Sequence, residues 1–315
     1  MAEGSGTEQE RGPESSDVPR QPQVDARLPP CFASLTSPSL SAISSFLQPE
    51  SQPSVAGLVD ALAPAMVYTD APNAVTNRKL WDAYAAAWDP SADFVKKMSS
   101  SLPPGGASIH RVGDEWSDVE SFQEVLRDWI LPHADNAIVA EIGSGGGRVA
   151  VELSRVAQRL ECFDISQNML SRASAAVASV EGACAASFHK LEIDSSGRTK
   201  FPSCEAQFDF VVVFDVLVHM DLHSTWHTLQ QVRRMLKQGG RAFLSVASIE
   251  TPLGWERFAK QSHFSVGGFY FMGKQNLATM LDRAGLRAVA WSSPSTETEN
   301  VYFNRDVLVL VEAPV

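Results

Sequence analysis

From Ala137 to the C-terminus, short runs of apolar and β-branched residues alternate with segments of helical periodicity. The runs predict strands over 137–142, 159–164, 187–192, 208–214, 241–246, 286–291 and 305–312. Segments 147–157 and 222–237 have the apolar spacing of helices between them. Strands that alternate with helices pair in parallel, and the helices cover both sheet faces. We therefore expect an α/β, doubly wound, seven-stranded and mostly parallel sheet.

The ends of several elements are predicted by individual residues. The helix over 222–237 is expected to begin at the cap Asp221 and to end at Gly239 and Gly240. Segment 291–304 is predicted to be a loop, so the last strand should return antiparallel to the strand before it.

Upstream of the sheet, the pattern is helical and then polar. Helices are expected over 55–66, 77–90 and 117–133, the last one capped by Ser117 or Asp118 and ending at Pro132. Residues 1–55 are rich in Ser, Pro, Glu and Gln, which predicts a disordered tail. The expected organisation is a tail over 1–55, an N-terminal helical cap or lid over 56–133, and the α/β domain over 134–315.

Composition narrows the range of partners. The formal charge of −11 and the pI near 5.1 argue against a nucleic-acid substrate. No apolar run is long enough to cross a bilayer, and the acid-rich first 30 residues resemble no targeting signal, so a cytoplasmic location without membrane attachment is expected. The four cysteines lack zinc-site spacing. His219, His223 and His227 are four apart, but no other ligand is evident nearby, and no metal is predicted.

The glycines after the first strand indicate a ligand. Gly143, Gly145, Gly146 and Gly147 stand between a predicted strand and helix, where bare backbone can approach a nucleotide. Three ligands are considered: a nucleoside triphosphate, a dinucleotide and S-adenosylmethionine. The triphosphate loop requires a Lys-Ser or Lys-Thr that is missing here, and the dinucleotide fingerprint requires a small residue where Arg148 stands.

The spacing is instead acid-x-G-x-G-x-G from Glu141 to Gly147, with Asp164 at the end of the second strand. Together with "AQFDFVVVFDVLVHMD" and "VRRMLKQGGRAFLSV", it resembles the class I S-adenosylmethionine-dependent methyltransferases. The resemblance is strongest over 134–250. It implies a seven-stranded Rossmann-like sheet and S-adenosylmethionine as cofactor.

The resemblance also implies roles for individual residues. Asp164 would accept hydrogen bonds from the ribose, Ile165 and Met169 would flank the adenine, and Glu192, with Asp194 as its rival, would meet the adenine amino group. The cofactor-binding set it implies is Glu141, Gly143, Ser144, Gly145, Gly147, Asp164, Ile165, Met169, Glu192 and Asp215.

Two residues after the fourth strand are candidates for catalysis. Asp215 would contact the cofactor or orient the acceptor, and its alternative is a structural acid. His219 would accept a proton from the acceptor, and its alternative is a packed histidine. Trp81, Tyr84, Trp88 and Trp116 are candidates for lining an acceptor pocket, with core packing as the alternative.

The loop after the fourth strand lacks an Asn/Asp-Pro-Pro-Tyr/Phe motif. Its absence argues against nucleic acids or glutamine side chains as methyl acceptors. We therefore expect methyl transfer to an O, S or N atom of a small molecule. A protein methyltransferase acting on a basic peptide, a non-catalytic scaffold and a nicotinamide-dependent oxidoreductase are the alternatives. The sequence does not indicate an oligomeric state.

Overall fold

The computed structural model describes residues 71–100, 102, 109–261, 268–294 and 299–315. The predicted tail over 1–55 and the predicted helix over 55–66 lie outside these residues.

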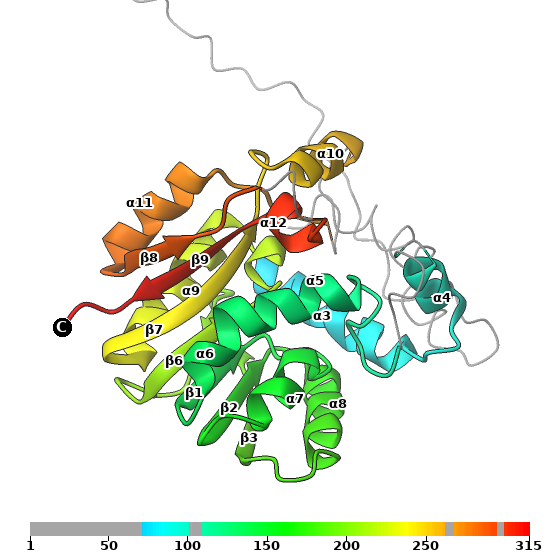
Figure 1. Ribbon diagram of the computed structural model, residues 1–315, viewed down its shortest axis with the longest axis horizontal. Coiled ribbons are helices and arrows are strands. Elements are labelled where there is room, and N and C mark those ends of the chain that lie inside the picture. The colour runs from blue at the N-terminus through cyan, green and yellow to red at the C-terminus, as the bar shows by residue number, and fades with distance from the viewer. Residues whose placement is uncertain (1–70, 101, 103–108, 262–267, 295–298) are drawn as a thin grey trace, which may run out of the picture.

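A seven-stranded sheet forms the centre of the described structure (Figure 1). Its strands are β1 (Ile138–Ile142), β2 (Arg159–Asp164), β3 (Ala185–Lys190), β6 (Phe208–Val213), β7 (Leu236–Ala247), β8 (Arg287–Trp291) and β9 (Asp306–Glu312). They are arranged in the order β3-β2-β1-β6-β7-β9-β8, and β9 is antiparallel to both of its neighbours. The predicted fold class, with an antiparallel last strand, is confirmed.

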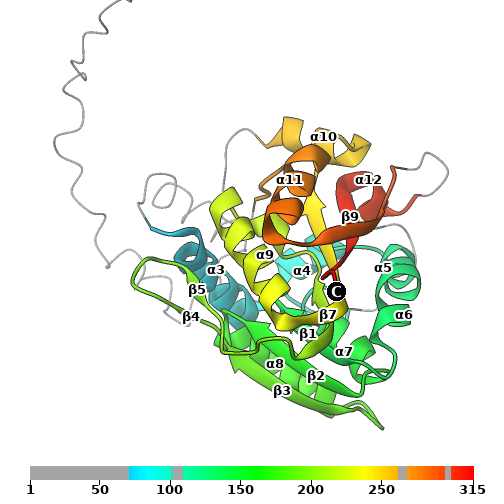
Figure 2. The same ribbon diagram turned by 90° about the vertical axis from the view of Figure 1, so that its left-hand side faces the viewer.

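Helices cover the sheet on both faces, as Figure 2 shows. One face carries α5 (Val119–Val125), the π-helical turn η1 (Leu126–Ile130), α6 (Leu131–Ala134), α7 (Arg148–Ser154), α8 (Gln167–Ala178) and α12 (Val301–Arg305). The other carries α9 (Leu222–Met235) and α11 (Lys274–Ala284). Each face has its own hydrophobic cluster. Val211, Val212 and Val213 are fully buried because both faces of β6 are covered.

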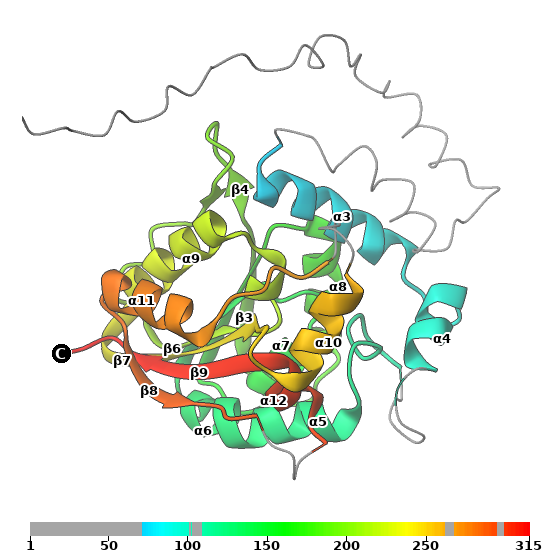
Figure 3. The same cartoon turned by 90° about the horizontal axis from the view of Figure 1, so that it is seen from above.

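The remaining elements lie around the carboxyl ends of the parallel strands. They are α3 (Asn73–Ala87), α4 (Asp93–Ser99), the two-stranded hairpin of β4 (Glu192–Ile193) and β5 (Thr199–Lys200), the short 3-10 turn η2 (Leu217–His219) and α10 (Pro252–Lys260). Figure 3 shows the β4–β5 hairpin beside the start of α3. The order in which strands are added to the sheet reverses between the parallel strands β1 and β6, since β2 and β3 lie on one side of β1 and the later strands on the other. Such a switch point is where open α/β sheets bind ligands.

Four local predictions are corrected. The helix through Pro132 continues to Ala134, because the chain widens into a π turn before the proline, where a missing N–H donor is tolerated. The helix capped by Asp221 ends at Met235 and not at the glycines, since Leu236 already pairs with Phe208 of β6.

The predicted loop before β9 contains α12, which is capped by the side chain of Asn300. The segment over 117–133 was expected to belong to the helical cap. It packs against the sheet through residues such as Phe122 and Leu126, and thereby forms part of the outer layer of the α/β domain.

Candidate functional site

The glycine turn after β1 serves two different structural needs. Gly143 and Gly147 have positive φ angles of 76° and 90°, and a Cβ atom at Gly143 would stand 2.4 Å from Val216 Cγ2. At Gly147 a Cβ atom would stand 2.8 Å from the Cα atom of Ala173. Gly145, with φ 51°, has no such neighbour within 4 Å. Close packing therefore requires the first and third glycines, while the second exposes bare backbone to the pocket.

Asp164 closes β2 directly beside this turn. Its Oδ2 accepts a hydrogen bond from the Gly145 N–H at 2.9 Å, and its Oδ1 accepts one from the Ser166 N–H at 2.8 Å. Each oxygen keeps acceptor capacity for a ligand hydroxyl. Burial raises the pKa of Asp164 to about 6, although both backbone hydrogen bonds oppose this shift.

Glu141 lies one layer deeper, near the end of β1. It is 3% exposed, and its Oε2 accepts a hydrogen bond from the Cys162 thiol at 3.6 Å. Burial raises the pKa of Glu141 to about 8, so the side chain is largely protonated at neutral pH. A cationic group placed near it would favour the ionised form.

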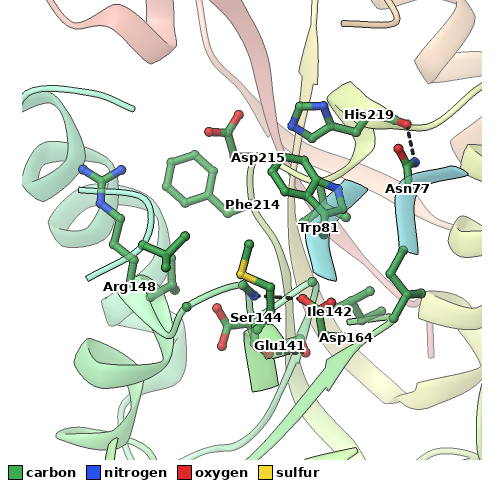
Figure 4. A pocket seen from close by; sticks show the side chains of 18 of the residues that line it. Asn77, Trp81, Glu141, Ile142, Ser144, Arg148, Asp164, Phe214, Asp215 and His219 are labelled. Atoms are coloured by element: carbon green, nitrogen blue, oxygen red, sulfur yellow. Dashed lines mark hydrogen bonds between the residues drawn. The ribbon is translucent and has the colours of Figure 1, made fainter. Parts of the chain in front are cut away.

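These residues line one pocket at the carboxyl ends of β1, β2 and β6 (Figure 4). Of the predicted site residues, the pocket brings together Trp81, Trp116, Glu141, Gly143, Ser144, Gly145, Asp164, Ile165, Met169, Asp215 and His219. The wall of the pocket also contains the aromatic side chains of Phe122, Phe214 and Tyr302.

Tyr84 and Trp88, which were predicted to bind the acceptor, do not line this pocket. Both side chains donate hydrogen bonds to the buried Glu115 carboxylate, at 2.6 and 3.0 Å. Trp116 Nε1 donates in turn to the Tyr84 hydroxyl at 3.2 Å. Tyr84 and Trp88 therefore support the pocket wall from behind, whereas Trp81 and Trp116 form it.

Glu192 is also placed outside the pocket. Its side chain is exposed in β4 and faces Arg78 and Lys190, each at 3.6 Å. Its rival Asp194 is a turn residue of the β4–β5 hairpin, where it accepts hydrogen bonds from Ser196 and Arg198. The residues around this hairpin that do line the pocket are Leu191, Thr199 and Phe201. Gly147 is likewise absent from the lining, because it packs against α8.

His219 is half-buried in the pocket wall. Its Nδ1 lies 3.3 Å from the Gly268 carbonyl oxygen, which can only accept, so Nδ1 carries the hydrogen and Nε2 is the free acceptor. The ring packs edge-on against Trp81 and Phe269, at centroid distances of 4.9 and 5.4 Å. Burial lowers the pKa of His219 to about 4, so the imidazole is neutral at physiological pH.

Asp215 follows β6 with a φ of 60°, in the left-handed region. Its Oδ1 accepts a hydrogen bond from Arg305 Nη2 at 2.7 Å, and its backbone N–H donates to Ser245 Oγ at 2.8 Å. The sequence analysis missed Arg305, because an arginine at the start of a strand gives no local sign of a partner 90 residues away.

The helix α3 is fastened over the pocket by hydrogen bonds to four segments. Asn77 Nδ2 donates to the His219 carbonyl at 2.8 Å, and Arg78 donates to the Leu191 carbonyl at 2.7 Å. Asp82 accepts a hydrogen bond from Ser166 at 2.6 Å, and Arg172 donates to backbone carbonyls at the end of the helix. Asn77 was also missed, although a buried asparagine on an otherwise apolar helix face can be noticed in a sequence.

The described residues contain neither a membrane-spanning helix nor a group of metal ligands. None of the helices between residues 71 and 315 that the structure describes is long and apolar enough to cross a membrane. In the same part of the chain, no three His, Cys, Asp or Glu side chains are grouped as metal ligands would be. His227, from the histidine series, faces the Thr199 carbonyl at 2.8 Å.

Comparison with known proteins agrees with this geometry. A family model described as a methyltransferase domain matches residues 139–240. The chain is 24% identical over 186 residues to the biotin biosynthesis bifunctional protein of Cellvibrio japonicus, a match over 57% of this chain and 33% of that protein. The chain therefore spans about a third of the length of this curated relative.

Solved structures share the fold. Magnesium protoporphyrin IX methyltransferase from Synechocystis, with bound S-adenosylhomocysteine, aligns with a TM-score of 0.52 at 16% identity over 76% of this chain and 99% of that one. A chain from the complex between the Haloferax volcanii Trm112 methyltransferase activator and a methyltransferase aligns with a TM-score of 0.52 at 19% identity, over 75% and 98% of the two chains.

Residues 139–240 match a methyltransferase domain, and the seven-stranded sheet has the fold of the class I S-adenosylmethionine-dependent methyltransferases. S-adenosylmethionine is the cofactor of this class of domain. The residues present fit this molecule, because Gly145 offers open backbone and Asp164 offers two acceptor oxygens at the same end of the pocket.

Proposed function

We propose that the protein transfers a methyl group from S-adenosylmethionine to an O, S or N atom of a small molecule. The observation that carries this proposal is the covered pocket, which continues from the glycine turn into an aromatic wall beneath α3. A wall of this kind encloses a small flat acceptor and excludes water. The magnesium protoporphyrin IX methyltransferase, whose name states a small-molecule acceptor, supports the proposal.

The cofactor end of the pocket has defined tasks. Asp164 would accept hydrogen bonds from the ribose hydroxyls, and Gly143, Ser144 and Gly145 would border the amino-acid part. Ile165 and Met169 would flank the adenine. When bound, S-adenosylmethionine supplies a methyl group that its sulfonium already activates. The protein therefore has to align the acceptor and remove its water, and such positioning can contribute about 7–11 kcal/mol.

At the acceptor end, Asp215 and His219 are the proposed catalytic groups. Both line the pocket, and the neutral imidazole of His219 has a nitrogen able to accept a hydrogen bond from a hydroxyl, thiol or amine. Its low pKa makes it a weak base, so its main task is to orient the acceptor proton. Trp81 and Trp116 would hold the body of the acceptor, beneath α3 acting as the lid.

The test is a calorimetric titration with S-adenosylhomocysteine, followed by incubation of the enzyme and labelled S-adenosylmethionine with a metabolite extract and, separately, with a protein extract. We expect binding and a labelled small molecule. Label only in protein would indicate a protein methyltransferase, and binding without any labelled product would indicate a non-catalytic scaffold. Either result contradicts the proposal.

A further inference from the structure

The turn at Asp215 is held in an unfavourable backbone conformation. A φ of 60° lies in the left-handed region, which residues with a side chain rarely adopt, and Asp215 is one of the few described non-glycine residues with a positive φ. The turn has a consequence for the cofactor end, because Val216 directly after it packs into the space that Gly143 leaves by having no Cβ. The conformation of Asp215 therefore sets the contact between the two loops that border the pocket.

Arg305 is the group that holds this turn from the other side. Its guanidinium donates to Asp215 at 2.7 Å and forms a two-point contact with Asp306, at 2.8 Å from Nε and 2.5 Å from Nη2. The side chains of Arg305, Asp215 and Asp306 are 7%, 13% and 0% exposed. Burial opposes the charge of Arg305, but the two carboxylates raise its pKa above the ordinary value. The group therefore remains a permanent cation.

The backbone around Arg305 is fixed as well. Its carbonyl accepts hydrogen bonds from Thr251 Oγ1 at 2.9 Å and from the Ser248 N–H at 3.3 Å. Its guanidinium carbon lies 5.0 Å from the ring centroid of Phe269 and 5.1 Å from that of Tyr302. These contacts fix the position of the Arg305 guanidinium. Its hydrogen bond to Asp215 therefore also fixes the position of the Asp215 carboxylate.

We propose that Arg305, brought from the C-terminal hairpin, is a positioning residue that holds the Asp215 turn and thereby the shape of the cofactor pocket. It does not line the pocket, and it acts only through Asp215. The inference rests on the proposed function, since it assigns Arg305 a part in building the same site.

The test is a double-mutant cycle with S-adenosylhomocysteine affinity as its readout, so that no acceptor is needed. Arg305→Lys keeps the charge but cannot contact both carboxylates at once, and Asp215→Asn removes the charge while asparagine tolerates the left-handed region. We expect each variant to weaken binding about tenfold, and the double variant to be no weaker than about tenfold, because both act on one contact.

The control is Arg287→Lys, an exposed arginine on β8 that pairs with Glu312 at 2.7 Å, and its affinity should equal that of the wild type. If Arg305→Lys does not fold, Arg305→Met combined with Asp306→Asn removes the buried pair together and takes its place in the cycle. Affinity within about twofold of wild type, or losses that multiply in the double variant, would overturn the proposal.

This outcome is separable from failure of the proposed function. A wild-type enzyme that binds S-adenosylhomocysteine without forming a methylated small molecule contradicts the proposed function only, whereas a cycle without coupling contradicts the role of Arg305 only. A wild-type enzyme that does not bind S-adenosylhomocysteine contradicts both.

Discussion

Asp164 joins the glycine turn to the end of β2. Its two oxygens each accept one backbone hydrogen bond, so the carboxylate is oriented and still able to accept from a ribose. An acid at this position was predicted from the sequence, because the end of a strand next to a glycine turn can be located from local pattern alone.

Asp164→Asn tests this residue directly. An amide presents a donor where a hydroxyl or a backbone N–H needs an acceptor, so we expect S-adenosylhomocysteine affinity to fall on the order of tenfold to a hundredfold. Isothermal titration calorimetry measures the loss. Asp209→Asn is the control, because Asp209 bonds the Ile138 N–H and Lys237 away from the pocket. Equal affinity of Asp164→Asn and wild type would contradict the assignment.

Glu141 predicts a pH dependence of stability. Its pKa in the folded protein is about 8, above the ordinary value of 4.5, so the folded state binds a proton that the unfolded chain releases across that window. The free energy of unfolding should therefore decrease as the pH rises from 5 to 8. Glu141→Gln removes this contribution, and the decrease should shrink by at least about 1.4 kcal/mol, the value of one pKa unit. Urea unfolding of the wild type and of Glu141→Gln at pH 5 and pH 8 measures this decrease. Equal decreases in the two proteins would contradict the raised pKa of Glu141.

Three of the predicted site residues, Tyr84, Trp88 and Glu192, lie outside the pocket, and the reasons differ. Tyr84, Trp88 and Trp81 occupy one predicted helix face, and nothing in the spacing says which of them reaches the pocket and which meets Glu115. Glu192 was placed by analogy, and the β4–β5 hairpin that carries it away from the pocket has no strong strand pattern.

At the scale of elements, the glycine turn and the loop after β6 meet at one contact. Gly143→Ala would place a methyl group 2.4 Å from Val216 Cγ2 at a positive φ. Gly182→Ala has nearly the same φ, 72°, but no neighbouring atom within 4 Å, so it controls for backbone strain. We expect both variants to lose about 1 kcal/mol of stability, and Gly143→Ala alone to lose further stability and S-adenosylhomocysteine affinity. Equal behaviour of the two variants in thermal unfolding and calorimetry would refute this.

The helix α3 should control ligand exchange. Asn77→Ala removes the 2.8 Å hydrogen bond to the His219 carbonyl and should loosen the helix. We expect faster dissociation of S-adenosylhomocysteine by a factor of about 3–10, consistent with the loss of one hydrogen bond, and faster amide exchange within α3. Lys79→Ala, on the exposed face of the same helix, is the control. Unchanged dissociation in stopped-flow fluorescence would show that α3 does not gate the pocket.

At the scale of the whole molecule, the sheet could be predicted from the sequence, but the long-range hydrogen bonds and ion pairs around it could not. All seven main strands appear in the sequence pattern, and the signal is strongest for β1, β6 and β9, whose apolar runs are buried along nearly their whole length. Contacts such as Arg305 with Asp215, or Asn77 with the His219 carbonyl, join residues 90 and 142 positions apart. Such pairings depend on the completed topology and leave no periodic sign in the chain.

Cofactor binding should stabilise the whole fold. The pocket joins the sheet, α3 and α12, so S-adenosylhomocysteine at a hundred times its Kd should add about 2.7 kcal/mol to the free energy of unfolding. The midpoint of thermal unfolding should rise with ligand concentration in the wild type and far less in Asp164→Asn at the same concentration. A midpoint that does not respond to the ligand in the wild type would contradict the location of the site.

His219 contacts α3 and the pocket through different atoms. Its main-chain oxygen accepts hydrogen bonds from Asn73 and Asn77, while its ring lines the pocket. Replacement of the imidazole therefore keeps both hydrogen bonds to α3 and removes only the ring contact with Trp81. The side chain at position 219 can therefore change while the hydrogen bonds to α3 are kept. Substitution at this position would alter which acceptor the pocket binds.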